Sequence, residues 1–381
     1  MTNTAKILTI YYKHKRGGFC KRIKMIIEAY LEKGWEVHYI AVAPYPYEHR
    51  NLVQHILPMP VSRHDGIIFW SYFFLAAPVY AFILGVKHRF ALISSVSPLY
   101  AWICAPTRQI LKIPMVTFLL TKPRFTTDCH EPYQALAGIE ALMEKTGVKA
   151  SSLLIANSHA CRDEWTRQMG KGYGGIEVHP NNIERMTFDR RQQREKLLKE
   201  FSLASDSFVV VTSSILEPHK NIETLIKAFG LNIHPRAVLI IIGDGEQKGE
   251  LTRLAGKLAA VKKIIFAGWR NDVVDIFQGA DMFALPSRRE GMSEALLEAG
   301  ACGIPCLVSA IPENMEVIRE TAQHFPVEGA EILAGKINQA IEDPGFYALL
   351  RENTQRDIQR YIFNWKENLT ERVESLLKDK A

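Results

Sequence analysis

The chain has 381 residues, of which 47% are hydrophobic and 23% are charged, and its formal net charge at pH 7 is +6. This length accommodates two ordinary domains with separate cores, and this composition excludes a largely disordered chain. The modest charge gives no reason to expect a nucleic-acid partner.

The cysteines and the N-terminus indicate the compartment. Cysteines occur at positions 20, 104, 129, 161, 302 and 306, without a Cys-x-x-Cys pair or histidines at metal-ligand spacing around them. This pattern favours free thiols in a reducing compartment, and no metal or cofactor is expected. Residues 1–12 lack the basic region, apolar core and cleavage site of a secretory signal. We therefore expect a cytoplasmic protein.

The first half of the chain alternates apolar, β-rich runs with helical patterns, which predicts a parallel sheet covered by helices on both faces. The predicted strands are residues 6–12, 35–42, 91–97, 115–120 and 153–158. Between the first two strands, apolar residues recur at helical spacing from Phe19 to Leu31, and Gly34 is a typical helix C-cap. The basic residues 13–24, around Gly17 and Gly18, suit phosphates or anionic lipid, but equally a solvated helix face.

Residues 66–86 carry no charge and are long enough, at about 30 Å of helix, to span a bilayer. The run lies between two predicted strands of one sheet, and a membrane span would separate them. Two interpretations remain. One is a buried helix interrupted near Pro78. The other is a helix in the membrane interface, with the basic residues 13–24 and 87–89 attracting anionic headgroups. The aromatic candidates for that interface are Phe69, Trp70, Tyr72, Phe73 and Phe74.

A second alternating series follows the charged residues 189–200, and the polar residues 180–185 mark the junction between two domains. The apolar, strand-like runs of this series are residues 208–214, 237–245, 263–268, 282–287 and 304–310, with helical patterns between them. Ligands of doubly wound sheets bind beyond the carboxyl ends of the strands, so we expect the functional residues in the loops there.

Two of these loops carry weak signals. Lys220 stands just before a helix that opens at Asn221, and an ammonium beside helix N-terminal amides suits a phosphate, although a lone surface Lys is the simpler interpretation. Gly243 and Gly245 follow an apolar strand and permit a tight turn with close backbone approach. No GxGxxG fingerprint follows any strand, which argues against a Rossmann dehydrogenase.

The segment 285–305, LPSRREGMSEALLEAGACGIP, carries the strongest signal. Glu290 lies in a loop after a strand, Ser293 is a plausible N-cap, and Glu298 lies in the following helix. Two carboxylates so placed suit the vicinal diols of a sugar and a ribose, and the amides of residues 291–294 suit the phosphates between them. Taken alone, glutamates on an amphipathic helix are usually only solvated.

The order of these motifs closely resembles that of family 4 glycosyltransferases, which have the GT-B fold. The match covers almost the whole second half, through Lys220–Asn221, GDG, FAGW, the block PSRREGMSEALLEAGACGIP and a late FNW before a terminal helix. The first half matches more loosely, through RGGF, an EV that opens the second strand, LLIANS and HPNNIE. Asn182 replaces a usual Gly, and Asn tolerates the left-handed conformation.

This resemblance implies an α/β protein of two doubly wound, Rossmann-like domains facing a cleft. Residues 1–185 would bind the acceptor, residues 186–360 the nucleotide-sugar donor, and residues 361–381 would form a helix that returns to the first domain. The implied reaction is a metal-independent, retaining, hexosyltransferase-like transfer from a nucleotide-diphosphate sugar to a saccharide or lipid-linked acceptor. Polysaccharide, lipopolysaccharide or glycolipid biosynthesis for the cell envelope, at the inner face of the membrane, would be the setting.

The resemblance also implies roles for single residues. Glu290 and Lys220 would be catalytic, binding the donor sugar and the diphosphate, and Glu298 would bind the ribose. Trp269 and Arg270 would meet the nucleobase, largely through their main chain. The implied donor site is completed by Gly17, Gly18, Gly243, Arg289, Gly291, Met292, Ser293 and Glu294.

Two positions depart from the family pattern. Ile215 stands where the family usually has a phosphate-binding Arg, and Leu119 where it usually has a His. Substitute cations are available in Arg288 and Arg289, and in Lys122 and Arg124, although loop cations are commonly only solvated. The alternatives left open are a non-catalytic, nucleotide-sugar-binding partner subunit and a nucleotide-sugar epimerase of the same fold.

Overall fold

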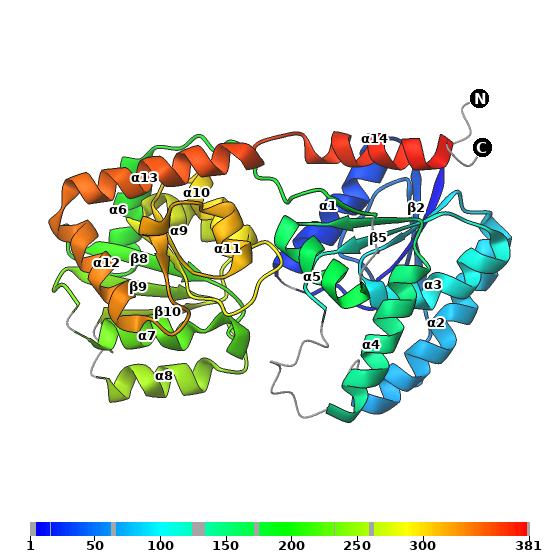
Figure 1. Ribbon diagram of the computed structural model, residues 1–381, viewed down its shortest axis with the longest axis horizontal. Helices are drawn as coiled ribbons and strands as arrows, with labels where there is room; N and C mark the ends of the chain where they lie inside the picture. The colour runs from blue at the N-terminus through cyan, green and yellow to red at the C-terminus, as the bar shows by residue number, and fades with distance from the viewer. Residues whose placement is uncertain are drawn as a thin grey trace. The chain divides into compact units, whose positions relative to one another are not determined.

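The computed structural model describes residues 5–15, 17–61, 66–123, 134–170, 175–231, 233–258 and 263–378. The chain divides into two compact units: unit 1 comprises residues 1–180 and 364–381, and unit 2 comprises residues 181–363. Each unit is a sheet of parallel strands with helices on both faces (Figure 1). The predicted α/β fold class, with two doubly wound Rossmann-like domains, is confirmed.

Unit 1 has a seven-stranded sheet in the order β3-β2-β1-β4-β5-β6-β7. Its strands are β1 (Lys6–Ile10), β2 (Glu36–Ala41), β3 (Leu52–Ile56), β4 (Leu92–Ser95), β5 (Met115–Leu119), β6 (Leu153–Ala156) and β7 (Ile176–Val178). Its helices are α1 (Gly18–Glu32), α2 (Gly66–His88), α3 (Pro98–Leu111), α4 (Gln134–Lys149), α5 (His159–Met169) and α14 (Trp365–Lys378).

Unit 2 has a six-stranded sheet in the order β10-β9-β8-β11-β12-β13. Its strands are β8 (Phe208–Ser213), β9 (Ala237–Ile242), β10 (Ile264–Gly268), β11 (Met282–Leu285), β12 (Cys306–Ser309) and β13 (His324–Phe325). Its helices are α6 (Arg190–Glu200), α7 (Ile222–Gly230), α8 (Lys248–Lys257), α9 (Val273–Gly279), α10 (Glu294–Ala301), α11 (Pro312–Val317), α12 (Ala330–Glu342) and α13 (Pro344–Ile358), with short 3₁₀ helices at Pro218–Lys220, Thr321–Gln323 and Gln359–Tyr361.

The core of unit 2 lies on both faces of its sheet. Val210 and Leu239 belong to the cluster on one face, whereas Val209, Val211 and Ile240 belong to the cluster on the other. Because successive side chains of a strand point to opposite faces, a strand that is buried on both sides reads as one continuous apolar run. This explains why the sequence shows apolar runs here instead of an alternation of polar and apolar residues.

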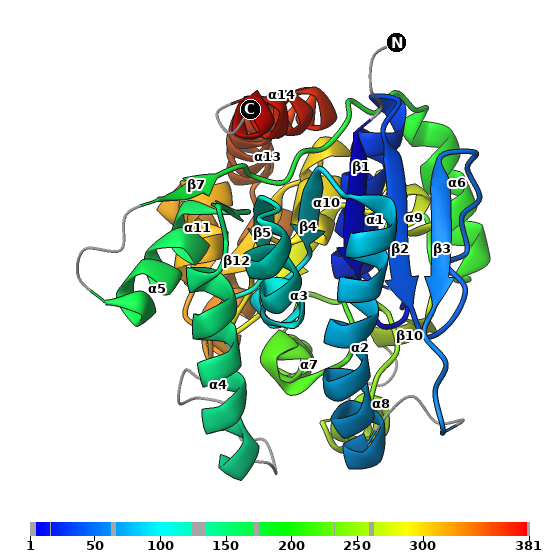
Figure 2. The ribbon, with the colours of Figure 1, turned by 90° about the vertical axis from the view of Figure 1, so that its right-hand side faces the viewer.

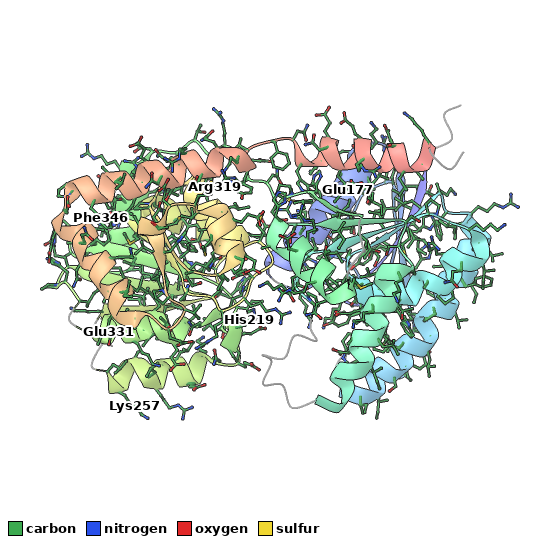
Figure 3. All side chains as sticks on the ribbon, viewed as in Figure 1. Glu177, His219, Lys257, Arg319, Glu331 and Phe346 are labelled. Atoms are coloured by element: carbon green, nitrogen blue, oxygen red, sulfur yellow. The ribbon has the colours of Figure 1, made fainter. Side chains whose placement is uncertain are left out.

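The terminal helix α14 belongs to unit 1. Arg372 donates to both carboxylate oxygens of Glu177, which is labelled in Figure 3, at 2.6 and 2.7 Å. Lys366 lies 3.0 Å from Glu28. The Arg22 guanidinium lies over the ring of Trp365, 4.9 Å from its centre. Arg22 is therefore buried, unlike the exposed Lys21 and Lys24 in the same basic segment.

The unit boundaries fall a few residues from the predicted ones, between 180 and 181 and between 363 and 364 instead of after 185 and 360. The reason is that the junction residues bond to unit 2: the Ile183 amide donates to the Tyr361 carbonyl at 2.8 Å. Asn182 does not adopt the left-handed conformation expected of a Gly replacement. Its side chain instead donates to the Phe363 carbonyl at 3.3 Å.

The uncharged run forms the helix α2, which continues through Pro78 without a break. It is the one helix among the described residues that is long and apolar enough to cross a membrane, and 28% of its most apolar window is buried. The strands on either side of it, β3 and β4, belong to the same sheet. A transmembrane position of α2 is incompatible with this sheet, as the sequence predicted.

The aromatic side of α2 faces the interior of unit 1. Phe69 and Phe73 are completely buried, where Phe69 packs on Tyr12 and Phe73 on Tyr100. The prediction that Phe69 and Phe73 lie in a membrane interface is therefore wrong. The physical reason is that a phenyl ring buries more apolar area in the interior of unit 1 than the neighbouring aliphatic side chains of α2 would.

The other three aromatic candidates are only partly buried. Trp70 and Phe74 stack on each other with ring centres 5.6 Å apart, and Tyr72 is 36% exposed. The outward side of α2 is aliphatic. This aliphatic face consists of Ile67, Ile68, Leu75, Val79, Ile83 and Val86, each more than half exposed.

Candidate functional site

Four neighbouring strands of unit 2 end at one edge of the sheet, and the loops after them carry the predicted donor-binding residues. Trp269 follows β10, Gly243 follows β9, Lys220 follows β8 and Glu290 follows β11, and these strands are adjacent in the order β10-β9-β8-β11. In a parallel sheet the carboxyl ends of such strands form the common ligand site. We call this place the carboxyl edge of unit 2.

The two predicted catalytic residues contact each other. Lys220 Nζ donates to both Glu290 carboxylate oxygens at 2.8 Å, and Ser287 Oγ donates to Glu290 Oε1 at 2.7 Å. The Glu290 side chain is 7% exposed and that of Lys220 is 19% exposed. A carboxylate this deeply buried needs a paired charge and hydrogen bonds, which Lys220 and Ser287 supply.

The loop that carries Lys220 is fixed to the loop that carries Glu290. Pro218 starts the short 3₁₀ helix, and Asn221 follows Lys220 in the left-handed conformation with φ 52°. The buried Asn221 side chain donates to the carbonyls of Pro286 at 3.0 Å and Val327 at 2.8 Å. These bonds fix the position of the loop of Lys220 relative to the loop of Glu290. Neither the conformation of Asn221 nor its partners were apparent from the sequence.

His219, labelled in Figure 3, is an electrostatic neighbour of both Lys220 and Glu290 and adds a neutral donor and acceptor near this pair. Loss of hydration, and then the positive charges of Lys220 and Arg289, lower the pKa of His219 below its ordinary value. The ring is therefore uncharged at pH 7, and its Nδ1 lies 3.3 Å from Glu217. Sequence reasoning missed His219, although it immediately precedes the Lys to which a role was given.

The cations suggested as substitutes for the missing Arg differ in how they are held. Arg288 is held by Glu328 at 2.7 and 2.9 Å and donates to the Pro218 carbonyl at 2.9 Å. Arg289 is half-buried and lies close enough to His219 to affect its pKa. Ile215 lies in the loop after β8, so its position agrees with the sequence prediction.

Arg270, predicted to lie at the nucleobase, uses its guanidinium within unit 2. It donates to both oxygens of Asp272 at 2.6 and 2.8 Å and lies 2.6 Å from Glu200. These hydrogen bonds, first to Asp272 and then to Glu200, raise the pKa of Arg270. A contact of this segment with a base would thus come from the main chain of Trp269 and Arg270.

The start of α10 is built as predicted. Ser293 is the N-cap, and its Oγ accepts from the Leu296 amide at 3.3 Å, so residues 291–293 lead directly into the helix. Asn181, from the junction, donates to Glu294 Oε1 at 2.9 Å and to the Met292 carbonyl at 3.3 Å. Asn181 is a further positioning residue that the sequence did not reveal. Glu298 lies one turn beyond Glu294 on α10 and is partly exposed.

Gly243 is required by the packing of three strand ends. Its φ is +136°, its amide donates to the Gly268 carbonyl at 2.8 Å, and a Cβ here would lie 1.8 Å from the Ser214 carbonyl oxygen. Only glycine fits such a position. The close backbone approach predicted for this turn is therefore present, and the partner in this structure is the protein's own β8 loop.

The predicted residues of unit 1 lie at the carboxyl ends of its own strands. Gly17, with φ +125°, is the N-cap of α1, and its carbonyl accepts from the Lys21 amide, while Gly18 begins that helix. Leu119 is fully buried in β5, so a core side chain stands where the family has a His. Lys122 is half-buried after β5, and Arg124 lies outside the described residues.

Comparisons with known proteins agree on the fold and on unit 2. Residues 193–357 match the family model of glycosyl transferases group 1. The UDP-Gal:α-D-GlcNAc-diphosphoundecaprenol α-1,3-galactosyltransferase of Escherichia coli is 33% identical over 162 residues, which is 40% of this chain and 41% of that relative. An uncharacterized glycosyltransferase of Methanocaldococcus jannaschii is 25% identical over 354 residues, 90% of each chain.

The fold as a whole is found in solved structures. Anabaena HepE in complex with UDP superposes with a TM-score of 0.78 at 22% identity, covering 97% of this chain and 100% of that one. This likeness covers both units, whereas the family model is confined to unit 2. The chain therefore has the GT-B fold, and residues 193–357 of its second unit match the family model of glycosyl transferases group 1.

Proposed function

We propose that this protein is a retaining glycosyltransferase that moves a sugar, in the manner of a hexosyltransferase, from a nucleotide-diphosphate sugar to an acceptor hydroxyl. The contact between Lys220 and Glu290 at the carboxyl edge of unit 2 carries this proposal. It is supported by the names of similar proteins, since the E. coli relative is a UDP-Gal-dependent galactosyltransferase and HepE was solved with UDP.

The buried ion pair suits a site that must hold two different groups of one donor. When the donor enters, Lys220 exchanges Glu290 for the diphosphate, and the Glu290 carboxylate accepts hydrogen bonds from the sugar hydroxyls. Both partners keep a charge-assisted bond, so neither is left buried and unpaired. Arg289 and the amides at the start of α10, capped by Ser293, would add positive potential to the phosphates.

The chemistry then follows from charge. The bond between the anomeric carbon and the diphosphate oxygen breaks, and the acceptor oxygen bonds to the same face of that carbon. The proton of the acceptor passes to the departing diphosphate, which leaves as the nucleoside diphosphate. Negative charge grows on the diphosphate, and preorganised cations and amides stabilise it. We expect no metal requirement: after chelation, Mg²⁺ or Mn²⁺ should not raise the rate.

The first experiment is a screen of the purified protein against UDP-, GDP- and ADP-sugars. Binding is read by thermal shift, and slow release of free sugar to water is read by chromatography. NMR of the first product should show the anomeric configuration of the donor. Donor binding without any turnover would indicate the non-catalytic partner subunit instead, and an isomerised donor without acceptor would indicate an epimerase.

We also propose that unit 1 rests on the cytoplasmic face of a membrane, where a lipid-linked acceptor would be presented. The aliphatic face of α2 supports this, because Ile68, Leu75 and Val79 lie at helical spacing and are 67%, 75% and 59% exposed. An exposed apolar patch of this kind marks an interaction site. The N-terminal halves of α2 and α4 extend past the carboxyl ends of the unit 1 strands (Figure 2).

Basic residues accompany this face. Tyr12 packs on Trp70 of α2 with ring centres 4.9 Å apart, and Lys15 lies over the Tyr12 ring at 5.0 Å. Lys13 and Lys15 are exposed, and each such cation contributes about 1 kcal/mol near an anionic surface. The charge thus favours anionic lipid over an apolar protein partner.

Flotation with anionic vesicles at low salt tests this. The double substitution Leu75→Asp/Val79→Asp should abolish flotation while leaving sugar transfer to a soluble acceptor intact. Leu349→Asp, at a 48% exposed position on α13 of unit 2, is the matched control and should still float. The proposed membrane contact would be contradicted if the wild-type protein stayed in solution. It would also be contradicted if light scattering showed that the protein forms dimers through this face.

A further inference from the structure

Three histidines from three different elements of unit 1 lie together. They are His38 on β2, His55 on the edge strand β3 and His88 at the end of α2. One ring nitrogen of each lies within 4.8 Å of the others. His38 is fully buried, and His55 and His88 are half-buried. We propose that these residues form a binding site for a zinc ion.

The hydrogen bonds of His38 fix the nitrogen that would bind the ion. Its Nε2 donates to Glu36 Oε1 at 2.5 Å, so its Nδ1 carries the lone pair. That Nδ1 lies 2.8 Å from His55 Nε2. A histidine that ligates a metal characteristically donates its other ring nitrogen to a carboxylate, which holds the ring in place. Glu36 is in this position, with Lys6 at 3.5 Å from the same oxygen.

His88 has a buried ring nitrogen that is available to a ligand. Its Nε2 is buried and has no hydrogen-bond partner among the described residues. A buried imidazole nitrogen without a partner costs free energy, and a ligand that it could bind would remove this cost. The ring lies 4.4 Å from that of His38 and 5.6 Å from that of His55, centre to centre. One of its ring nitrogens lies within 4.8 Å of a nitrogen of His38 and of His55, so the ring borders the same small space.

The geometry suits a tetrahedral ion. With Zn–N bonds of about 2.0 to 2.1 Å, two ligand nitrogens of a tetrahedral site lie about 3.3 Å apart. The His38–His55 pair must open slightly, and His88 must approach by rotation of its ring. His55 loses its Nε2 proton to solvent and takes one up at Nδ1, so its charge does not change. Three imidazoles and one water complete four-coordination, and this ligand set favours zinc over magnesium or calcium.

The surroundings indicate how the ion would link neighbouring elements of unit 1. Phe90 packs edge-on against His38 at 4.9 Å and stacks on His88 at 5.9 Å, which shields one side from water. The ion would join β2, the edge strand β3 and the end of α2, which are far apart in sequence. All three histidines belong to unit 1, and none of the proposed donor-binding residues of unit 2 takes part in this site. A zinc ion here would therefore not conflict with a glycosyl transfer that needs no metal.

The experiment uses the full chain without a histidine tag, stripped with a chelator and dialysed. Zinc should bind with a stoichiometry of one and raise the thermal unfolding temperature by about 5 °C at saturating ion. Cobalt should give the visible absorption of a four-coordinate site and be displaced by zinc. Sugar transfer is measured in parallel, and its presence or absence does not bear on this result.

Single variants separate the site from adventitious binding. His55→Gln and His88→Gln should each weaken zinc binding at least about 10-fold and abolish the cobalt spectrum. His49→Gln, in the same connection between β2 and β3 but outside the cluster, should bind like wild type. Circular dichroism shows that each variant is folded. A folded wild type that binds no zinc, or a His55→Gln/His88→Gln double variant that binds it equally well, would overturn the proposal.

Discussion

The carboxyl edge of unit 2 is built from charged side chains that pair with one another, whereas the corresponding region of unit 1 combines aromatic packing and an aliphatic helix face with the exposed Lys13 and Lys15. In unit 2, Lys220, Ser287 and Glu290 form one bonded group, and Asn221 ties their loops together. In unit 1, Tyr12 and Phe69 pack beside a helix whose outer face is aliphatic.

The difference is consistent with what each unit is proposed to bind. A nucleotide-diphosphate sugar offers the same phosphates and ribose to every donor site, so its recognition motifs can stay constant. Acceptors differ in chemistry, and the surface that meets them differs with them. This agrees with the extent of the family match, which covers residues 193–357 and stops short of unit 1. The following predictions test the comparison, from the largest expected effect to the smallest.

Lys220→Met should reduce sugar transfer by about 100- to 1,000-fold, because it removes a cation from the site of the developing negative charge. It also leaves the buried Glu290 without its charge partner, so stability should fall by several kcal/mol. Lys227→Met is the matched control, since Lys227 forms an exposed i,i+4 pair with Glu223 on α7. It should cost less than about 0.5 kcal/mol and leave turnover unchanged. Equal losses in the two variants would remove Lys220 from the mechanism.

Gly243→Ala should destabilise unit 2 by about 2 to 4 kcal/mol, because the added Cβ meets the Ser214 carbonyl and the backbone there has positive φ. Gly249→Ala, on α8 with open space around its Cβ position, should be neutral or slightly stabilising. Urea unfolding monitored by circular dichroism measures both. If Gly243→Ala left the free energy of unfolding unchanged, the three strand ends would have to be able to separate.

Arg289→Ala should lower kcat by about 10- to 100-fold if Arg289 replaces the family's missing Arg. Arg288→Ala should have a much smaller effect on kcat, because Arg288 is already held by Glu328 and the Pro218 carbonyl. Steady-state kinetics with an authentic donor compares them. The reverse order of the two effects would assign the phosphate to Arg288 instead.

Unit 1 should lose stability as the pH falls from 6.5 toward 4, partly through His179. Burial lowers the pKa of His179 to about 4, so the unfolded chain takes up this proton first and is favoured as the pH falls. The loss is at most about 3 kcal/mol, and it fades as the pH rises above 6.5, where the unfolded chain also releases this proton. Five of the six tryptophans lie in unit 1, so fluorescence during urea unfolding reports mainly on that unit. His179→Gln should flatten the pH profile, and an unchanged slope would exclude His179 as its source.

The sequence by itself determined the fold class, because apolar runs that alternate with helical patterns have few solutions other than parallel sheets with helices on both faces. It also determined the stretch of unit 2 that carries the candidate site, since Lys220, Gly243 and Glu290 each follow a buried strand. It excluded a membrane span at α2, because β3 and β4 must share a sheet.

Only the tertiary structure decided which side of α2 is exposed. The helix is apolar all round, so no periodicity marks an inward face, and the buried position of Phe69 and Phe73 depends on rings supplied by Tyr12 and Tyr100. The same holds for the partners of Glu290 and for the cluster of His38, His55 and His88. Their members are separated in sequence by up to 70 residues, and contacts over such distances are set by the order of the strands, which local patterns do not specify.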